Sequence, residues 1–369
     1  MPGRTMTRSK PPTIAIDAMG GDFGPRVLVP GAIDAARQQS LRLKLVGFAH
    51  AVETELARFD THGLDVEVVH ADDVAAMGDK PSHIMRRRKN TSIQVCCNLV
   101  KDGEADGVVS AGHTGVALGC GIFTIGRIKG IERPGLAAFL PREKNPVILI
   151  DVGANVDSKP RHLVQFAIMG DALARNVLKL TEPKVGILNI GEEQGKGNVQ
   201  VNEAYPLFEH TDLNFVGNVE GRDLFGGRAD VIVCDGFVGN VALKLSEGLG
   251  SAFSSILRNE LSNGFPSRLG AFMARSGLRR FKKRLDYEEH GGAPLLGLNA
   301  PMFIGHGSAG RRSIQMTTLM TATFIGNQAN EDIKHGLEIN PEITKFQRLR
   351  KMLHSSGRGH GNDEDSGEE

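Results

Sequence analysis

The chain has 369 residues, which fits one large or two fused domains of about 100–200 residues and excludes a small disulfide-stapled scaffold. Its 44 Lys and Arg residues nearly balance its 43 Asp and Glu residues, so no global charge attracts nucleic acid or a membrane. The four cysteines, Cys96, Cys97, Cys120 and Cys234, match neither a disulfide framework nor a zinc site. We therefore expect a reduced cytosolic protein without structural metal.

Both ends of the chain have compositions typical of disorder. Residues 1–12 are polar and rich in proline, and the acidic residues 355–369 include no hydrophobic residue. No apolar secretory segment and no run near 18 apolar residues is present, so we expect neither secretion nor a membrane span. The intervening residues, 13–354, are expected to form a single α/β domain.

Short apolar runs and helical segments alternate along this domain. The runs predict strands at 14–16, 43–46, 66–69, 107–109, 147–150, 185–188, 215–217 and 231–233. Helical spacing predicts helices that include 27–38, 51–59, 92–100 and 162–180. This alternation is typical of a parallel sheet covered by helices, so the fold class is α/β.

Small and polar residues follow five of the predicted strands, in the segments 14–25, 108–119, 149–157, 188–198 and 233–244. Because ligands of open α/β sheets bind at the carboxyl ends of strands, we expect these loops to converge on one crevice. Glycine-rich loops let backbone N–H groups approach an anion. The set predicts a phosphate or carboxylate site, although any one loop alone also fits a tight turn.

Several residues in these loops are candidates for chemistry. Asp17 is a helix cap, a loop brace or the nucleophile of an acyl-phosphate mechanism. His113 is a general acid or base, a neutral donor to an anion, or an ordinary loop histidine. Lys196, between two glycines, is either a phosphate or oxyanion ligand or an exposed loop residue. Asn240 is an N-cap candidate that also suits a transition-state hydrogen bond, with Asp235 orienting its neighbours.

Residues 241–290 break the alternation and predict an amphipathic helical hairpin, with a helix stop at 263–266. Its connector carries Phe265, Leu269 and Phe272, where polar residues are usual. The cations of the second arm are Arg275, Arg279, Arg280, Lys282, Lys283 and Arg284. The hairpin is either a core element with a solvated charged face or a surface that contacts acidic lipid or an acidic protein.

Other common functions lack their motifs. The chain has no GxxxxGK[ST], GxSxG or HExxH motif and no GxGxxG after the first strand, which disfavours kinases, serine hydrolases, metallopeptidases and ordinary dehydrogenases. The basic run at 86–89 has no interleaved aromatic residues, so we expect no nucleic-acid binding. A local anion or carrier contact, or a solvated turn, suits this run better.

As a set, the loops resemble those of the phosphate acyltransferase family of bacterial phospholipid synthesis. The matching stretches are IAIDAMGGDFGP, RRRKNTS, SAGHTGV, GRIKGIERP, LIDVGANVD, HLVQFAIMG, LNIGEEQGKGN, DGFVGNVALK, GGAPLLGL and GHGSAG. The resemblance implies transfer of a fatty acyl group from acyl carrier protein to inorganic phosphate, without a cofactor. It also implies a three-layer α/β/α, Rossmann-like fold similar to that of phosphate acetyltransferase and isocitrate dehydrogenase. A homodimer that contacts the inner face of the cell membrane peripherally through the hairpin is implied as well.

The resemblance also suggests roles for individual residues. Lys196 would hold phosphate and oxyanion charge, and Asn240 would donate in the transition state, with Asp235 and His113 beside them. The expected phosphate contacts are Asp17, Gly20, Gly21, Gly112, Thr114 and Gly115. His113 stands where the family usually has Asn, Gly195 stands where a second Lys is common, and the acidic tail lies outside the family pattern. The competing hypotheses are a non-catalytic membrane scaffold for lipid-synthesis enzymes and a dehydrogenase of related fold.

Overall fold

The computed structural model describes residues 10–76, 78–79, 81–285 and 291–341, without the side chains of residues 82, 85, 86 and 282–285. The expected tails at 1–12 and 355–369 lie outside this part, apart from residues 10–12, and so does the expected domain end at 354. Lys282, Lys283 and Arg284 belong to a described helix, but their side chains lie outside the described part.

All named strands of the described chain belong to one sheet. The strands are β1 Thr13–Asp17, β2 Arg42–Gly47, β3 Asp65–His70, β4 Gly107–Ser110, β5 Gly135–Leu140, β6 Val147–Ile150, β7 Lys184–Leu188, β8 Asn214–Val219, β9 Val231–Val233, β10 Ala293–Leu296 and β11 Met302–Ile304. Their order in the sheet is β3-β2-β1-β4-β11-β10-β5-β6-β9-β7-β8. The eight predicted strands are all present, whereas β5, β10 and β11 were not predicted.

The sheet consists of two parallel blocks that run in opposite directions. The strands β3-β2-β1-β4-β11 form one block and β6-β9-β7-β8 the other. Between them, β10 is antiparallel to both neighbours and β5 is antiparallel to β6. Three reversals place the carboxyl ends of β1 and β4 at the edge opposite to those of β6, β7 and β9. The five loops therefore do not leave the sheet at one edge, because the unpredicted antiparallel strands invert half of it. Residues of three of them, 108–119, 149–157 and 233–244, still line one cavity.

Helices cover both faces of the sheet and give three layers. They are α1 Pro25–Gln38, α2 Ala49–Leu56, α3 Pro81–Arg87, α4 Ser92–Lys101, α5 Thr114–Cys120, the π-helix η1 Gly121–Ile125, α6 Pro160–Val177, α7 Val199–Glu209, α8 Asp223–Gly226, α9 Gly236–Ser262, α10 Gly264–Met273, α11 Arg275–Leu285, α12 Arg311–Gly326 and α13 Ala329–Ile339. One hydrophobic core joins α1, α6, α7 and α12 to one face. A second core joins α4, α5, η1 and the start of α9 to the other. The predicted α/β class is confirmed.

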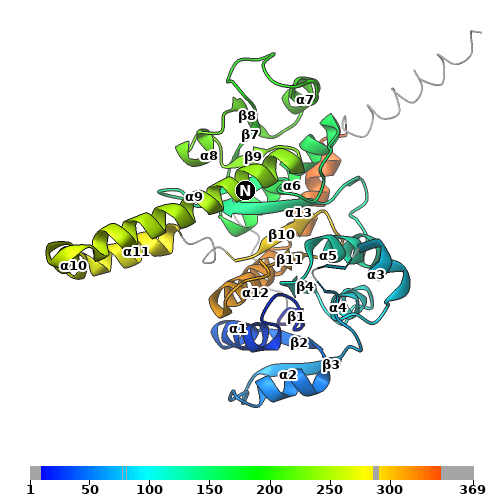
Figure 1. Ribbon diagram of the computed structural model, residues 1–369. Helices are drawn as coiled ribbons and strands as arrows, with labels where there is room; N and C mark the ends of the chain where they lie inside the picture. Colours follow the sequence, from blue (N-terminus) through cyan, green and yellow to red (C-terminus); the bar gives the residue numbers. More distant parts are fainter. Residues whose placement is uncertain (1–9, 77, 80, 286–290, 342–369) are drawn as a thin grey trace, which may run out of the picture.

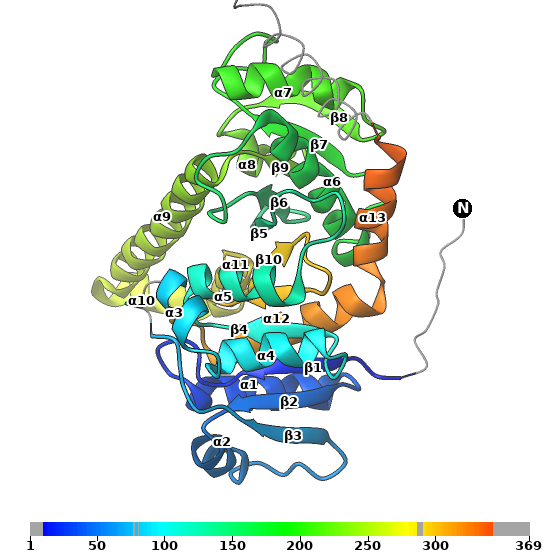
Figure 2. The same ribbon diagram turned by 90° about the vertical axis from the view of Figure 1, so that its right-hand side faces the viewer.

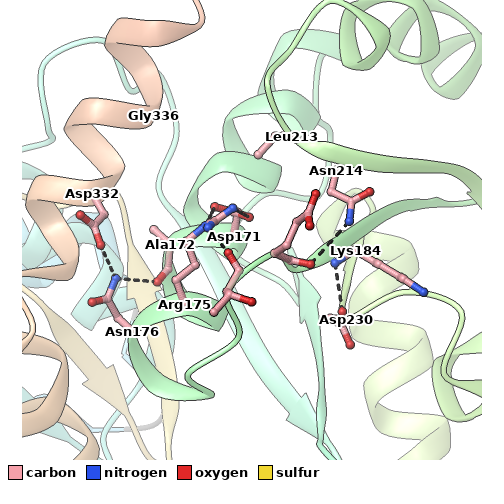
Figure 3. Close-up of polar contacts among 12 residues, drawn as sticks. Asp171, Ala172, Arg175, Asn176, Lys184, Leu213, Asn214, Asp230, Asp332 and Gly336 are labelled. Atoms are coloured by element: carbon pink, nitrogen blue, oxygen red, sulfur yellow. Dashed lines mark hydrogen bonds and ion pairs between the residues drawn. The ribbon is translucent and has the colours of Figure 1, made fainter. Parts of the chain in front are cut away.

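Polar contacts fix the helices around the second block (Figure 3). The Nδ2 atom of Asn176, in α6, donates to the carbonyl of Ala172 at 2.9 Å and to Asp332 of α13 at 2.7 Å. The backbone N–H of Lys184 donates to Asp230 at 3.0 Å, which ties the start of β7 to the turn before β9. Because Asn176 is buried, losing either partner would leave an unpaired polar group in the core.

The predicted hairpin is present and projects from the body of the molecule (Figure 1). Helix α9 ends at Ser262, and α11 returns along it with the rings of Phe253 and Phe281 6.0 Å apart. The segment interpreted as a flexible connector is instead the helix α10, which begins after Asn263. No helix among the described residues is both long and apolar enough to cross a membrane.

Candidate functional site

A cavity of about 290 Å³ lies between the two blocks, on the face of the sheet that carries α5 and α9. In Figure 2, α9 runs to the left of β5 and β10, and α5 lies below them. The apolar wall of this cavity includes Leu136, Val152, Leu243 and Ile304. Its polar lining residues include Thr114, Asn240, Lys244, Glu247, His306 and Ser313. The loops after β4 and β6 and the start of α9 therefore meet across the face of the sheet. We call this space the cleft.

Glycines bring the first turn of α9 against the loop after β6. A Cβ atom at Gly239 would lie 1.8 Å from the carbonyl oxygen of Asp151, and one at Gly236 would lie 2.5 Å from that of Asn155. Only glycine fits at such distances. The close approach places Asn240 beside Gly153, where an added Cβ would be 3.7 Å from the Asn240 side chain. Both residues line the cleft, and Asn240 is exposed.

The cap of α9 differs from the expected one. Asp235 is the N-cap, since its Oδ1 accepts hydrogen bonds from the N–H groups of Phe237 and Val238, each at 3.0 Å. Asn240 lies one turn inside the helix, so the N-cap role considered for it is wrong. Asp235 does not line the cleft. It caps the start of the helix that carries Asn240.

A second, much smaller cavity of about 10 Å³ lies against Asp17 at the end of β1. It has room for about one water-sized group. The sheet register pairs Asp17 with Ser110, and the Ser110 hydroxyl donates to Asp17 Oδ2 at 2.7 Å. Gly20, Gly112 and His113 also line this space, so two of the expected phosphate loops do meet here. We call it the Asp17 cavity.

Burial raises the pKa of Asp17, and the nearby hydroxyls of Ser92 and Ser110 oppose this rise. The side chain is only 3% exposed. Its other oxygen, Oδ1, has no hydrogen-bond partner of ordinary geometry among the described residues. Asp17 does not cap a helix, since α1 begins eight residues later, and a loop-bracing bond to Ser110 is what the structure shows.

Part of the basic run at 86–89 braces a loop that lines the Asp17 cavity. Val74 and Ala75 line the cavity, and the Arg88 guanidinium donates to the Val74 carbonyl at 2.8 Å. Arg88 also pairs with Asp73 and, at 2.7 Å, with Asp79. The hydrogen bond from Arg88 lowers the pKa of Asp73. Arg88 is therefore a brace for this loop rather than an open anion ligand.

His113 faces the Asp17 cavity with one ring nitrogen already engaged. Its Nδ1 accepts a hydrogen bond from the N–H of Gly115 at 3.0 Å, which caps α5. In the neutral ring, an accepting Nδ1 places the proton on Nε2. His113 is thus arranged as a donor through Nε2, which fits the neutral-donor interpretation better than that of a general base.

The expected glycine ligands occupy strained or crowded backbone positions. The N–H of Gly112 donates to Ser110 Oγ at 3.0 Å, and the N–H of Gly20 donates to the Asp17 carbonyl at 3.1 Å. Gly21 has a φ of 73°, and a Cβ there would lie 2.8 Å from the Gly307 carbonyl. These glycines let the loops after β1, β4 and β11 pack together. Thr114 lies where this packing meets the cleft.

Lys196 and Asn240 follow neighbouring strands. The exposed side chain of Lys196 belongs to the loop after β7, which pairs in parallel with β9, the strand that precedes Asn240. The Asn189 amide holds this loop by donating to the Lys196 carbonyl at 2.8 Å. Among the described residues, Lys196 lines neither cavity. The two residues therefore share an edge of the second block without sharing a cavity wall.

The remaining expected contact residues lie on the hairpin. Phe265, Leu269 and Phe272 of α10 are exposed, and the Arg275 guanidinium lies 4.9 Å from the Phe272 ring centroid. Arg279 and Arg280 are exposed on α11. These residues belong to α10 and α11, at the end of the hairpin that projects from the body of the molecule (Figure 1).

Sequence reasoning missed the apolar wall of the cleft and the serine beside Asp17. The wall includes Leu136 on β5 and Ile304 on β11, two strands that were not predicted. Ser110 belongs to the glycine-containing stretch 108–119, but its link to Asp17 spans 93 residues of sequence. Only the strand order reveals that contact.

Comparisons with known proteins agree with this architecture. Residues 12–332 match the model of the family described as "Fatty acid synthesis protein". A phosphate acyltransferase of Nitratidesulfovibrio vulgaris is 55% identical over 90% of this chain and 97% of its own length. That of Lawsonia intracellularis is 53% identical over 92% and 99%. A phosphotransacetylase structure from Streptococcus pyogenes shares the fold, with a TM-score of 0.59, 20% identity and coverage of 88% and 95%. The chain belongs to the phosphate acyltransferase family.

Proposed function

We propose that this protein transfers a long-chain fatty acyl group from the thioester of acyl carrier protein to inorganic phosphate, as a step toward phospholipids. The products would be acyl phosphate and the free carrier thiol. One observation carries the proposal: Thr114 and Asn240, from opposite blocks of the sheet, line one cleft whose remaining wall is largely apolar. A polar end for phosphate beside an apolar wall for an acyl group is what this reaction requires.

The chemistry asks for positioning and for stabilisation of charge. A phosphate oxygen attacks the thioester carbonyl, the C–O bond forms, and the carbonyl oxygen becomes an oxyanion until the C–S bond breaks. The Asn240 amide is exposed to the cleft and is assigned the hydrogen bond to that oxyanion. Thr114 is assigned to the phosphate, through its hydroxyl and backbone N–H. The departing sulfur takes up a proton to give the free thiol.

Lys196 is assigned a supporting electrostatic role. Gly195 and Gly197 on either side of it have φ angles of 89° and 98°, so glycine suits both positions. The Gln200 side chain donates to the Ser158 carbonyl at 2.5 Å and ties the following helix to the loop after β6. A long cation on this neighbouring loop can supply positive charge at the open side of the cleft once the acyl donor is bound.

The test is phosphate-dependent release of carrier thiol from long-chain acyl carrier protein. Removing one oxyanion donor by Asn240→Ala should slow kcat by about 10²–10³-fold. Asn145→Ala, at the opposite end of β6 and exposed, is the matched control and should turn over normally. We also expect Lys196→Ala to slow turnover, with Lys184→Ala at the other end of β7 as its control.

Two results would contradict these assignments. Normal turnover in both Asn240→Ala and Lys196→Ala would reject the site. No thiol release by the wild-type protein with any acyl donor would favour the alternative of a non-catalytic membrane scaffold.

We also propose that the hairpin is the membrane contact. Phe265 is 79% exposed and Phe272 is 63% exposed beside Arg275, Arg279 and Arg280, and this pairing of apolar and basic groups suits an anionic bilayer surface. Charge reversal at Arg279 and Arg280 should abolish sedimentation with anionic liposomes while turnover in solution persists. Unchanged sedimentation would remove this assignment. A homodimer is proposed from the family resemblance and is tested by the mass of the protein in solution.

A further inference from the structure

We propose that Asp17 selects hydrogen phosphate over fully ionised tetrahedral anions such as sulfate, by accepting a hydrogen bond from the P–OH group that enters the Asp17 cavity. The inference rests on the proposed use of phosphate and names the residue that would recognise its proton. Asp17 is thereby a residue that determines anion specificity, and it forms no covalent bond during the reaction.

The first observation is the state of the carboxyl group. Asp17 is 3% exposed and its Oδ2 accepts from the Ser110 hydroxyl at 2.7 Å, whereas its Oδ1 accepts no hydrogen bond of ordinary geometry from the described residues. The Ser92 hydroxyl and the N–H groups of Met19 and Gly20 lie near enough to lower the pKa of this carboxyl against the effect of burial. A buried acceptor without a partner is costly unless something fills it. The space beside it is about 10 Å³, enough for one oxygen-sized group.

The second observation is the comparison with Asp151, the other fully buried aspartate at a strand end. Its Oδ1 accepts from the backbone N–H groups of Leu136, Gly153 and Ala154, and its Oδ2 accepts from the backbone and side chain of Asn155. Asp151 is therefore saturated by the protein. Asp17 is the carboxyl that keeps an acceptor unused.

The third observation is the charge around the Asp17 cavity. Its described lining includes no cationic side chain, and His113 is its one group with a basic ring. A fully ionised anion placed there would meet an ionised carboxylate without compensation. Hydrogen phosphate can present its O–H to the carboxylate, whereas sulfate at neutral pH has no proton to donate.

The Asp17 cavity and the cleft are lined by neighbouring residues. His113 lines the Asp17 cavity and the next residue, Thr114, lines the cleft. A phosphate held with its O–H toward Asp17 and its other oxygens toward Thr114 would present an attacking oxygen to the acyl group. This arrangement uses the carboxyl to orient phosphate as well as to select it.

The experiment is isothermal titration calorimetry of the full chain with inorganic phosphate, arsenate and sulfate at pH 7. Arsenate also carries a proton at this pH, so the wild-type protein should bind phosphate and arsenate alike and bind sulfate about 10- to 100-fold more weakly. In Asp17→Asn, whose amide is isosteric and donates to any tetrahedral anion, the preference should fall below about fivefold. Asp171→Asn is the control, since burial also raises the pKa of Asp171 but this residue lines neither cavity, and its phosphate-to-sulfate ratio should match the wild type.

Folding is checked by near-ultraviolet circular dichroism, and Ser110→Ala provides a second variant that keeps the carboxyl but removes its orienting hydroxyl. Its selectivity should be intermediate. An unchanged ratio in folded Asp17→Asn, or equal binding of sulfate and phosphate by the wild type, would overturn the inference and leave the proposed transfer reaction intact. Selective phosphate binding lost in Asp17→Asn, together with no thiol release by the wild type, would overturn the proposed reaction and leave the inference intact.

Discussion

Asp17 and Asp151 end their strands in similar surroundings and differ in what they bind. Each is buried, burial raises the pKa of each, and each follows a strand in its own block of the sheet. Asp151 accepts five hydrogen bonds that fold the loop at 151–155. Asp17 accepts one side-chain hydrogen bond of ordinary geometry, from Ser110, and its Oδ1 accepts none from the described residues, although the Ser92 hydroxyl lies near enough to lower its pKa. Burial and a raised pKa are therefore common to both carboxyl groups. What distinguishes them is the number of hydrogen bonds that each accepts from the protein.

We expect the largest effect on the free energy of unfolding from a substitution where α9 packs on the loop at 151–155. Gly239→Ala would place a Cβ 1.8 Å from the Asp151 carbonyl oxygen, so the backbone must shift, and we expect a loss of about 3 kcal/mol or more in unfolding free energy. Gly248→Ala is the control in the same helix, with no atom within 4 Å of the added Cβ, and it should be neutral or stabilising by up to about 1 kcal/mol. Urea unfolding measures both, and equal effects would contradict the described packing.

The next largest effect compares the contributions of the two aspartates to the free energy of unfolding. Asp151→Asn replaces one accepting oxygen by an NH2 group that faces existing donors, so we expect a loss of about 2–4 kcal/mol in unfolding free energy. Asp17→Asn should change it by less than about 1 kcal/mol at neutral pH, because the amide oxygen can still accept from Ser110. Similar losses in both variants would show that the comparison is mistaken.

A pH series tests the buried charge at Asp17. The folded protein holds this proton above the pH at which the unfolded chain releases it, so the stability of the wild type should fall as pH rises from about 4 through the folded pKa. Asn does not titrate. The stability of Asp17→Asn relative to the wild type should therefore increase over that range, as followed by thermal unfolding. A difference that stays constant with pH would mean that Asp17 has an ordinary pKa.

The smallest change in the free energy of unfolding is expected for a substitution at Ser110. Ser110→Ala removes one hydrogen bond to Asp17 and one acceptor for the N–H of Gly112, which we expect to cost about 1–2 kcal/mol. Chemical unfolding measures this loss. A larger loss than that of Asp151→Asn would contradict the order of effects proposed here.

Much of the fold could be predicted from local sequence. The eight runs rich in Val, Ile and Leu are strands, and the stop near Asn263 is the end of α9. The three missed strands lack that signal: β5 has no β-branched residue, β10 contains Pro294, and β11 has only three residues. They lie in the middle of the sheet and reverse its direction. Without them, the prediction placed all five loops in one crevice, whereas residues of three of the loops line the cleft.

The sequence predicted which residue types belong to the candidate site, but not which of these residues lie together. The glycine stretches correctly indicated loops that pack closely, and Asn240 and Thr114 do line one cleft. The bond between Ser110 and Asp17 depends on strand pairing between residues far apart in sequence. The neighbourhood of the loops that carry Lys196 and Asn240 likewise depends on the pairing of β7 with β9, which no local pattern encodes.

The most direct test of the whole account is a crystal structure of the protein with bound phosphate. We expect the anion at the junction of the two cavities, with one oxygen within hydrogen-bonding distance of Asp17 Oδ1, another near Thr114, and Asn240 facing it across the cleft. Phosphate bound elsewhere, for example only at the exposed loop around Lys196, would contradict it.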